Sequence, residues 1–152
     1  MTADATQRLD MPEITKLSQL LRIAIDDATW AHQSDQYVLN MDWWHRSDEF
    51  GQPCEVCLAG SVLARRSSMS SHNDVVPDQV PRFSKAMYAL DCLRCGDIED
   101  ALYTLDQDMS IPAGLVSKWD VPPLSDNPSS DEFAKWRDSL LKLANHLEEH
   151  GA

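Results

Sequence analysis

The sequence predicts a mainly α-helical, compact single domain of about five helices with one short strand or a minor β-hairpin. Three observations support this fold class. Apolar residues recur with helical spacing in several long segments. The length of 152 residues is typical of one domain. The chain has no strand–helix alternation that would indicate a parallel sheet, and no repeat with a period of about 20–50 residues.

The first two helices are expected at 12–32 and 54–66. Apolar side chains in 12–32 fall on one helical face. Asp10 can cap this helix, and Pro12 suits its first turn, where a missing N–H costs nothing. Apolar residues in 54–66 surround the whole helix, a pattern typical of a central helix, and several are small enough to let a neighbour approach closely.

Between these helices, residues 36–43 alternate between apolar and polar side chains and predict one half-buried strand. Successive residues of a strand face opposite sides, so Trp43 would face the core and Trp44 the other side. Trp44 is then either an exposed aromatic residue suited to binding a partner, or covered by another element. Both interpretations are open at this point.

Two further helices follow a Ser- and Pro-rich stretch, 67–81, which predicts an irregular loop. The segment 83–95 has one apolar face, and Gly96 can end it in a left-handed conformation. Asp97 can then cap a short helix over 97–105.

The last helix, 130–149, follows a second irregular, proline-rich segment, 107–128. Ser129 and Glu132 have the spacing of a capping box. The expected buried stripe consists of Phe133, Trp136, Leu140, Leu143, Ala144 and Leu147. We expect a single domain over 1–152, with a flexible N-terminus at 1–10.

Charge and composition narrow the classes of function. The 25 acidic residues exceed the 13 lysines and arginines, which gives a net charge of −12 and disfavours binding to nucleic acids and anionic membranes. The adjacent pair Arg65-Arg66 is too small a basic patch for nucleic-acid binding. No apolar run approaches the roughly 18 residues of a membrane span, and MTADATQRLD has no apolar signal core. We therefore expect a cytoplasmic protein without direct nucleic-acid or membrane contacts.

The sequence carries no catalytic signature. Its five glycines are scattered and build no phosphate-binding loop, and HExxH and GxSxG are absent. Acid–base catalysis would need carboxylates that converge in a cleft. We expect no enzyme, no catalytic residues and no cofactor; a small-ligand pocket or an enzyme whose residues converge only in three dimensions is the alternative.

The four cysteines form two pairs, Cys54 with Cys57 and Cys92 with Cys95, in the pattern C-x2-C-x34-C-x2-C. This spacing can hold tetrahedral zinc. Both pairs also lie in or beside apolar helical patterns, where cysteine commonly packs as a small apolar residue. We expect packing and no bound metal, and a zinc-stabilised small module is the alternative. We do not expect redox chemistry at Cys54 and Cys57, because the sequence around them does not predict the βαβ unit of thioredoxin-like proteins.

The segments CEVCLAGSVLA and ALDCLRCGDIEDAL resemble small uncharacterised proteins of bacteriophages and prophages that carry a Cys-x-Val-Cys-x-Ala-Gly helix. The resemblance covers about a sixth of the chain. It implies the cytosol of an infected bacterium as the setting and an accessory role, and it carries over no activity and no catalytic residue.

We therefore expect a non-enzymatic phage accessory protein that binds and inhibits or modulates a host or defence component. Its acidic surface would be steered toward a basic surface of that partner. A nucleic-acid mimic is a special case, which would require a spaced array of acids on one face; solvated helices are often equally acidic. The expected partner-binding residues are Trp44, Asp97, Glu99, Asp100, Asp106 and Asp108.

Overall fold

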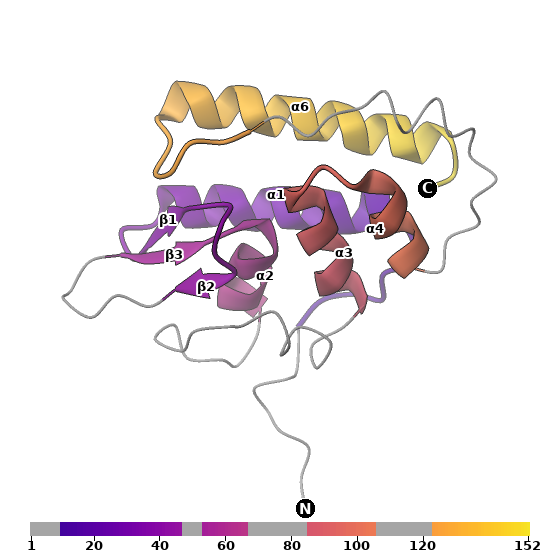
Figure 1. Cartoon of the computed structure of the whole chain (residues 1–152), viewed down its shortest axis with the longest axis horizontal. Coiled ribbons are helices and arrows are strands. Elements are labelled where there is room, and N and C mark those ends of the chain that lie inside the picture. The colour runs from indigo at the N-terminus through magenta and orange to yellow at the C-terminus, as the bar shows by residue number, and fades with distance from the viewer. Residues whose placement is uncertain (1–9, 47–52, 67–84, 106–122) are drawn as a thin grey trace, which may run out of the picture.

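The computed structural model describes residues 10–46, 53–66, 85–105 and 123–152 (Figure 1). Within these residues the chain forms five helices and a three-stranded sheet, so the predicted mainly α fold is confirmed. None of these helices is long and apolar enough to cross a membrane. The elements are α1 (Leu17–Gln33), β1 (Tyr37–Leu39), β2 (His45–Arg46), β3 (Cys54–Val56), α2 (Leu58–Arg66), α3 (Lys85–Arg94), α4 (Ile98–Thr104) and α6 (Ser130–Glu149).

Helix α1 lies at the centre of the packing. It contacts α6 and α2 most extensively, and α6 runs along its length (Figure 1). The two long helices are antiparallel: the Ser18 N–H donates to the Ala152 carbonyl at 3.0 Å, and the His32 ring stacks on Phe133 with centroids 4.3 Å apart. Buried apolar residues from the five helices, β1 and β3 form one hydrophobic cluster with Trp44, Leu124 and Ala152.

Helix α6 follows the prediction closely. Its range and its buried stripe are those expected from the sequence. The Ser129 hydroxyl accepts a hydrogen bond from the Glu132 N–H at 3.2 Å, but the Glu132 carboxylate accepts from the Ser125 N–H at 2.8 Å. The carboxylate is therefore bonded to the preceding segment, and only the serine half of the capping box forms.

The turn between α3 and α4 is also confirmed. Gly96 has a φ of +78°, and its N–H donates to the Leu93 carbonyl at 2.9 Å, as expected for a left-handed helix end. The Asp97 side chain accepts from the Asp100 N–H at 2.9 Å and caps α4. The two helices consequently fold back on one another and pack together.

The first helix begins at Leu17, later than predicted. Lys16 has extended backbone angles and makes no side-chain cap, so neither Asp10 nor Pro12 has the expected role. The Asp10 N–H instead donates to the Arg66 carbonyl at 2.8 Å. This contact holds the segment before α1 beside Arg66, the last residue of α2.

Strand β1 is shorter than the predicted strand 36–43 because Asn40 forms a turn after it. The Asn40 side-chain oxygen accepts from the Asp42 N–H at 3.0 Å, an Asx turn, and its carbonyl accepts from the Trp43 N–H at 3.2 Å. The turn breaks the alternation of faces. Trp43 is 43% exposed and Trp44 only 2% exposed, so the prediction that Trp43 faces the core is wrong.

The start of the predicted helix 54–66 is also wrong, because its first residues form strand β3. This strand lies in the middle of the sheet, parallel to β1 and antiparallel to β2. The Cys54 N–H donates to the Gln36 carbonyl at 2.9 Å. Because sheet pairing uses the backbone groups at the start of this segment, α2 begins only at Leu58.

The predicted irregular segments 1–10, 67–81 and 107–128 lie largely outside the described residues. The described end of the last one, 123–128, forms no helix or strand, as expected. It is fixed to the sheet, because the Asn127 N–H donates to the Leu39 carbonyl at 2.9 Å.

Candidate functional site

Trp44 is not an exposed partner-binding residue. Its side chain is buried, and its indole Nε1 donates to Asp91 Oδ1 at 2.8 Å. The alternative interpretation, in which another element covers Trp44, is therefore confirmed. The neighbouring Trp43 is the exposed aromatic residue, with the Arg46 guanidinium 4.6 Å from its ring centroid.

Helix α4 carries the predicted acidic residues that the structure describes. Asp97, Glu99 and Asp100 are all exposed. Asp106 and Asp108 lie outside the described residues. The opposite side of α4 is buried and consists of Ile98, Ala101 and Leu102. Glu99 and Asp100 therefore lie on the solvent side of α4, next to the capping residue Asp97, and α4 packs against α3.

Tyr103 extends this surface and was missed in the sequence. Its side chain is 73% exposed, the largest exposed fraction among the big apolar side chains of the described residues. It lies three and four residues after Asp100 and Glu99, so all three share one helical face. We call the set Asp97, Glu99, Asp100 and Tyr103 the α4 face. Helical spacing could have predicted its exposure. If Ile98, Ala101 and Leu102 face the core, residue 103 faces solvent.

No family model, curated protein or solved structure matches this chain. The resemblance to bacteriophage proteins stays a prediction.

The four cysteines lie in different environments. Cys54 and Cys57 are buried at the sheet and the start of α2, Cys92 is half-buried on α3, and Cys95 is exposed beyond it. Within the described part of the chain, no three histidine, cysteine, aspartate or glutamate side chains are grouped to hold a metal ion. The expectation of a metal-free protein stays a prediction.

Thiol reactivity should follow these environments. Burial raises the pKa of Cys57 to about 11, and burial together with nearby acids raises the pKa of Cys92 to about 11. The thiolate is the reactive form of cysteine, and a raised pKa leaves little thiolate near pH 8. Cys57 and Cys92 should therefore react slowly. We expect Cys95 to react fastest with a disulfide reagent, measured by absorbance and mapped by mass spectrometry. Cys95→Ser should abolish the fast phase; its persistence would contradict this assignment.

The pair Arg65-Arg66 is part of the fold. Asp27 on α1 is fully buried, and its carboxylate accepts from Arg65 at 2.9 Å and from Arg66 at 2.6 and 3.0 Å. Arg65 also contacts Asp26 at 3.1 Å. Both guanidinium groups are thus paired with carboxylates and link α2 to α1, so they do not form a free basic patch.

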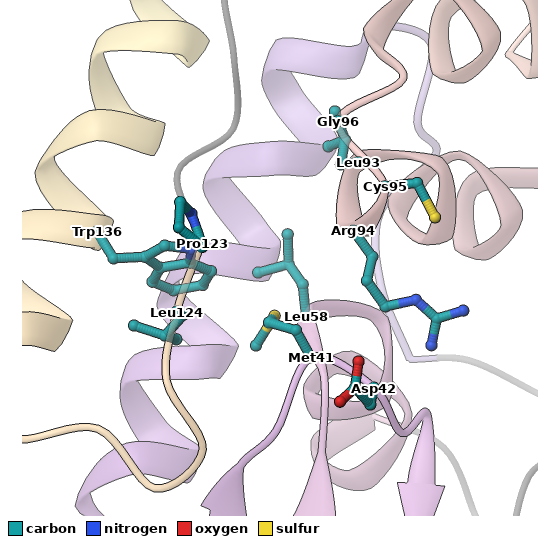
Figure 2. Close-up of a pocket in the computed structure, with 10 residues that line it drawn as sticks. All are labelled: Met41, Asp42, Leu58, Leu93, Arg94, Cys95, Gly96, Pro123, Leu124 and Trp136. Atoms are coloured by element: carbon teal, nitrogen blue, oxygen red, sulfur yellow. The ribbon is translucent and has the colours of Figure 1, made fainter.

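A pocket of about 470 Å³ opens where the turn after β1, the start of α2, the end of α3 and the middle of α6 meet (Figure 2). Its volume lies within the roughly 300–1,000 Å³ of small-molecule sites. The residues that line it are Met41, Asp42, Leu58, Leu93, Arg94, Cys95, Gly96, Pro123, Leu124 and Trp136. Sequence reasoning missed this pocket, whose lining comes from segments far apart in the chain.

The pocket has one apolar side and one charged side. Figure 2 shows Trp136 and Leu124 on one side, Arg94 and Asp42 on the other, and Leu58 between them. Such a pocket can bury the apolar part of a ligand while the charged residues orient its polar end.

Proposed function

We propose that this protein is a stoichiometric binding protein that engages a basic protein surface through the α4 face. The observation that carries the proposal is the 73% exposure of Tyr103 beside exposed acids of the same helix. Tyrosine is enriched among residues that dominate binding energy, because it buries much surface and still offers a hydroxyl.

The charge of the protein supports the same proposal. A net charge of −12 raises the association rate with a basic surface, and the acids of the α4 face would fix its orientation there. By its resemblance to phage proteins, we propose that the partner is a host or defence component in the bacterial cytosol. The protein would inhibit or modulate that partner by occupying its surface, with no chemistry of its own.

The test compares variants for binding to the partner, once affinity purification from host cells and mass spectrometry have identified it. We expect Glu99→Lys combined with Tyr103→Ser to weaken binding by roughly tenfold or more, because it removes an aromatic anchor and reverses a charge. Asp35→Lys makes the same single charge reversal at an exposed position between α1 and β1, at the end of the molecule opposite α4 (Figure 1), and should bind like the unmodified protein. Titration calorimetry measures all three.

Salt gives a second readout. Attraction between an acidic and a basic surface is screened over about 8–10 Å at ordinary ionic strength, so the affinity should fall as salt rises. The double variant should lose part of this salt dependence. Equal binding by all three proteins, or catalytic turnover by the purified protein, would refute the proposal.

A further inference from the structure

The charged side of the pocket contains a cation and an anion that do not pair with each other. Arg94 and Asp42 both line the pocket, and Figure 2 shows them on the same side of it. Among the residues that the structure describes, Arg94 forms its ion pair with Asp91, at 2.5 Å. The Asp42 carboxylate accepts no hydrogen bond and forms no ion pair with the described residues, and its backbone N–H is bonded to Asn40. A ligand would thus meet the Arg94 guanidinium, which is already paired with Asp91, and the Asp42 carboxylate.

Two contacts in sequence hold Arg94 in place: Arg94 pairs with Asp91, and Asp91 is hydrogen-bonded to Trp44. The Asp91 carboxylate oxygen that contacts Arg94 also accepts from the buried Trp44 indole N–H at 2.8 Å. The Asp91 and Arg94 side chains are each only 20% exposed. Because a guanidinium has five N–H donors, this anchoring leaves donors for a ligand and fixes their direction.

The remaining walls are apolar. Met41, Leu58, Leu93, Leu124 and Trp136 surround the cavity, with the Trp136 indole on the side opposite the charged residues (Figure 2). A volume of about 470 Å³ accommodates a leucine-sized or phenylalanine-sized side chain together with a polar head group.

We infer that the pocket binds a free α-amino acid with an apolar side chain. The ligand carboxylate would pair with Arg94, its ammonium with Asp42, and its side chain would lie against Trp136 and Leu58. Guanidinium groups match carboxylates in bidentate geometry, and a carboxylate accepts strong hydrogen bonds from an ammonium. Such a ligand is neutral overall, so the charge of −12 does not repel it.

Ligands with only one charge fit less well. An apolar carboxylate would leave Asp42 unpaired and would approach a strongly acidic protein. An apolar amine would leave the free donors of Arg94 without an acceptor and place two cations side by side. A polar group left without its partner in a binding site costs affinity, so the pocket should discriminate against both.

The first test is titration calorimetry of the full-length protein with five compounds. We expect L-phenylalanine or L-leucine to bind at one site per chain. Three compounds should bind at least tenfold more weakly, because each lacks one of the three features: 2-phenylethylamine lacks the carboxylate, 3-phenylpropionate lacks the ammonium, and glycine lacks the side chain. No binding of either apolar amino acid, or equally tight binding of the amine or the acid, would overturn the inference.

The second test uses three variants. Asp42→Asn changes an exposed side chain after β1 and should weaken L-phenylalanine binding at least tenfold while leaving 3-phenylpropionate binding unchanged or stronger. Met41→Trp should block binding by filling the cavity. Asp35→Asn makes the same chemical change at an exposed position outside the pocket and should bind normally. Circular dichroism verifies that all three fold.

Undiminished L-phenylalanine binding by folded Asp42→Asn would overturn the assigned roles. Because none of these residues belongs to the α4 face, failure of this inference leaves the proposed protein-binding function standing, and the reverse also holds.

Discussion

Gly60→Ala is expected to lower the free energy of unfolding by more than about 4 kcal/mol, an unusually large loss for one methyl group. A Cβ atom at this position would lie 1.4 Å from the Trp44 carbonyl oxygen, 2.6 Å from its carbonyl carbon and 3.2 Å from Val56 Cβ. The two closest atoms are backbone, so no side-chain rotation relieves the overlap. Helix α2 would have to move away from the chain at Trp44, which separates buried surfaces.

The position of Trp44 makes this movement costly. Its indole is bonded to Asp91 on α3, and strand β2 begins at the next residue. Shifting its carbonyl therefore disturbs the sheet on one side and α3 on the other. The close approach explains why a glycine is needed at position 60.

Urea denaturation followed by circular dichroism measures the loss, and Gly96→Ala is the matched control. A Cβ at Gly96 would have no atom within 4 Å, and its φ of +78° costs alanine about 1–2 kcal/mol. A Gly60→Ala variant no less stable than Gly96→Ala would mean that α2 does not approach Trp44 this closely.

The position and buried face of a helix were predictable where they depend only on residues close together in the sequence. The buried stripe of α6, from Phe133 to Leu147, consists of six apolar residues at helical spacing. Its backbone hydrogen bonds lie within the helix and need no partner from another segment. The α3–α4 turn was predictable for the same reason, because Gly96 and Asp97 act through contacts within a few residues.

The errors arise where distant residues decide the local structure. The segment before α1 is bonded to Arg66 through the Asp10 N–H, and β3 pairs with β1 and β2. A short apolar run such as Cys54–Val56 is compatible with either a strand or a helix until its partner is known. Such partners cannot be inferred from spacing in one sequence.

The two tryptophans show how a small local feature reverses a side-chain assignment. The turn at Asn40 changes which residue faces inward, so Trp43 and Trp44 exchange the expected environments. The acids of α4 were predictable because they share one helix. The pocket was not, because residues as distant as Met41 and Trp136 form its walls.

Trp136→Ala is expected to lower the free energy of unfolding by about 3–5 kcal/mol, the usual cost of truncating a buried large aromatic side chain. The Trp136 side chain is buried at 4% exposure, and its ring lies 5.6 Å from that of Phe133 at an angle of 40°. It also forms one wall of the pocket. Removing the indole would open this wall toward the interface of α6 with the rest of the core, and the bordering side chains would lose contacts that water does not replace.

Trp43→Ala makes the same chemical change at a side chain that is 43% exposed, and it should cost about 1 kcal/mol or less. Chemical denaturation measures both, with circular dichroism as the signal because each variant removes a fluorescent residue. A loss below about 1 kcal/mol for Trp136→Ala would mean that α6 packs through a different face. That result would also remove the apolar wall on which the amino-acid site depends. A large loss for Trp136→Ala alone supports the packing of α6 through Trp136.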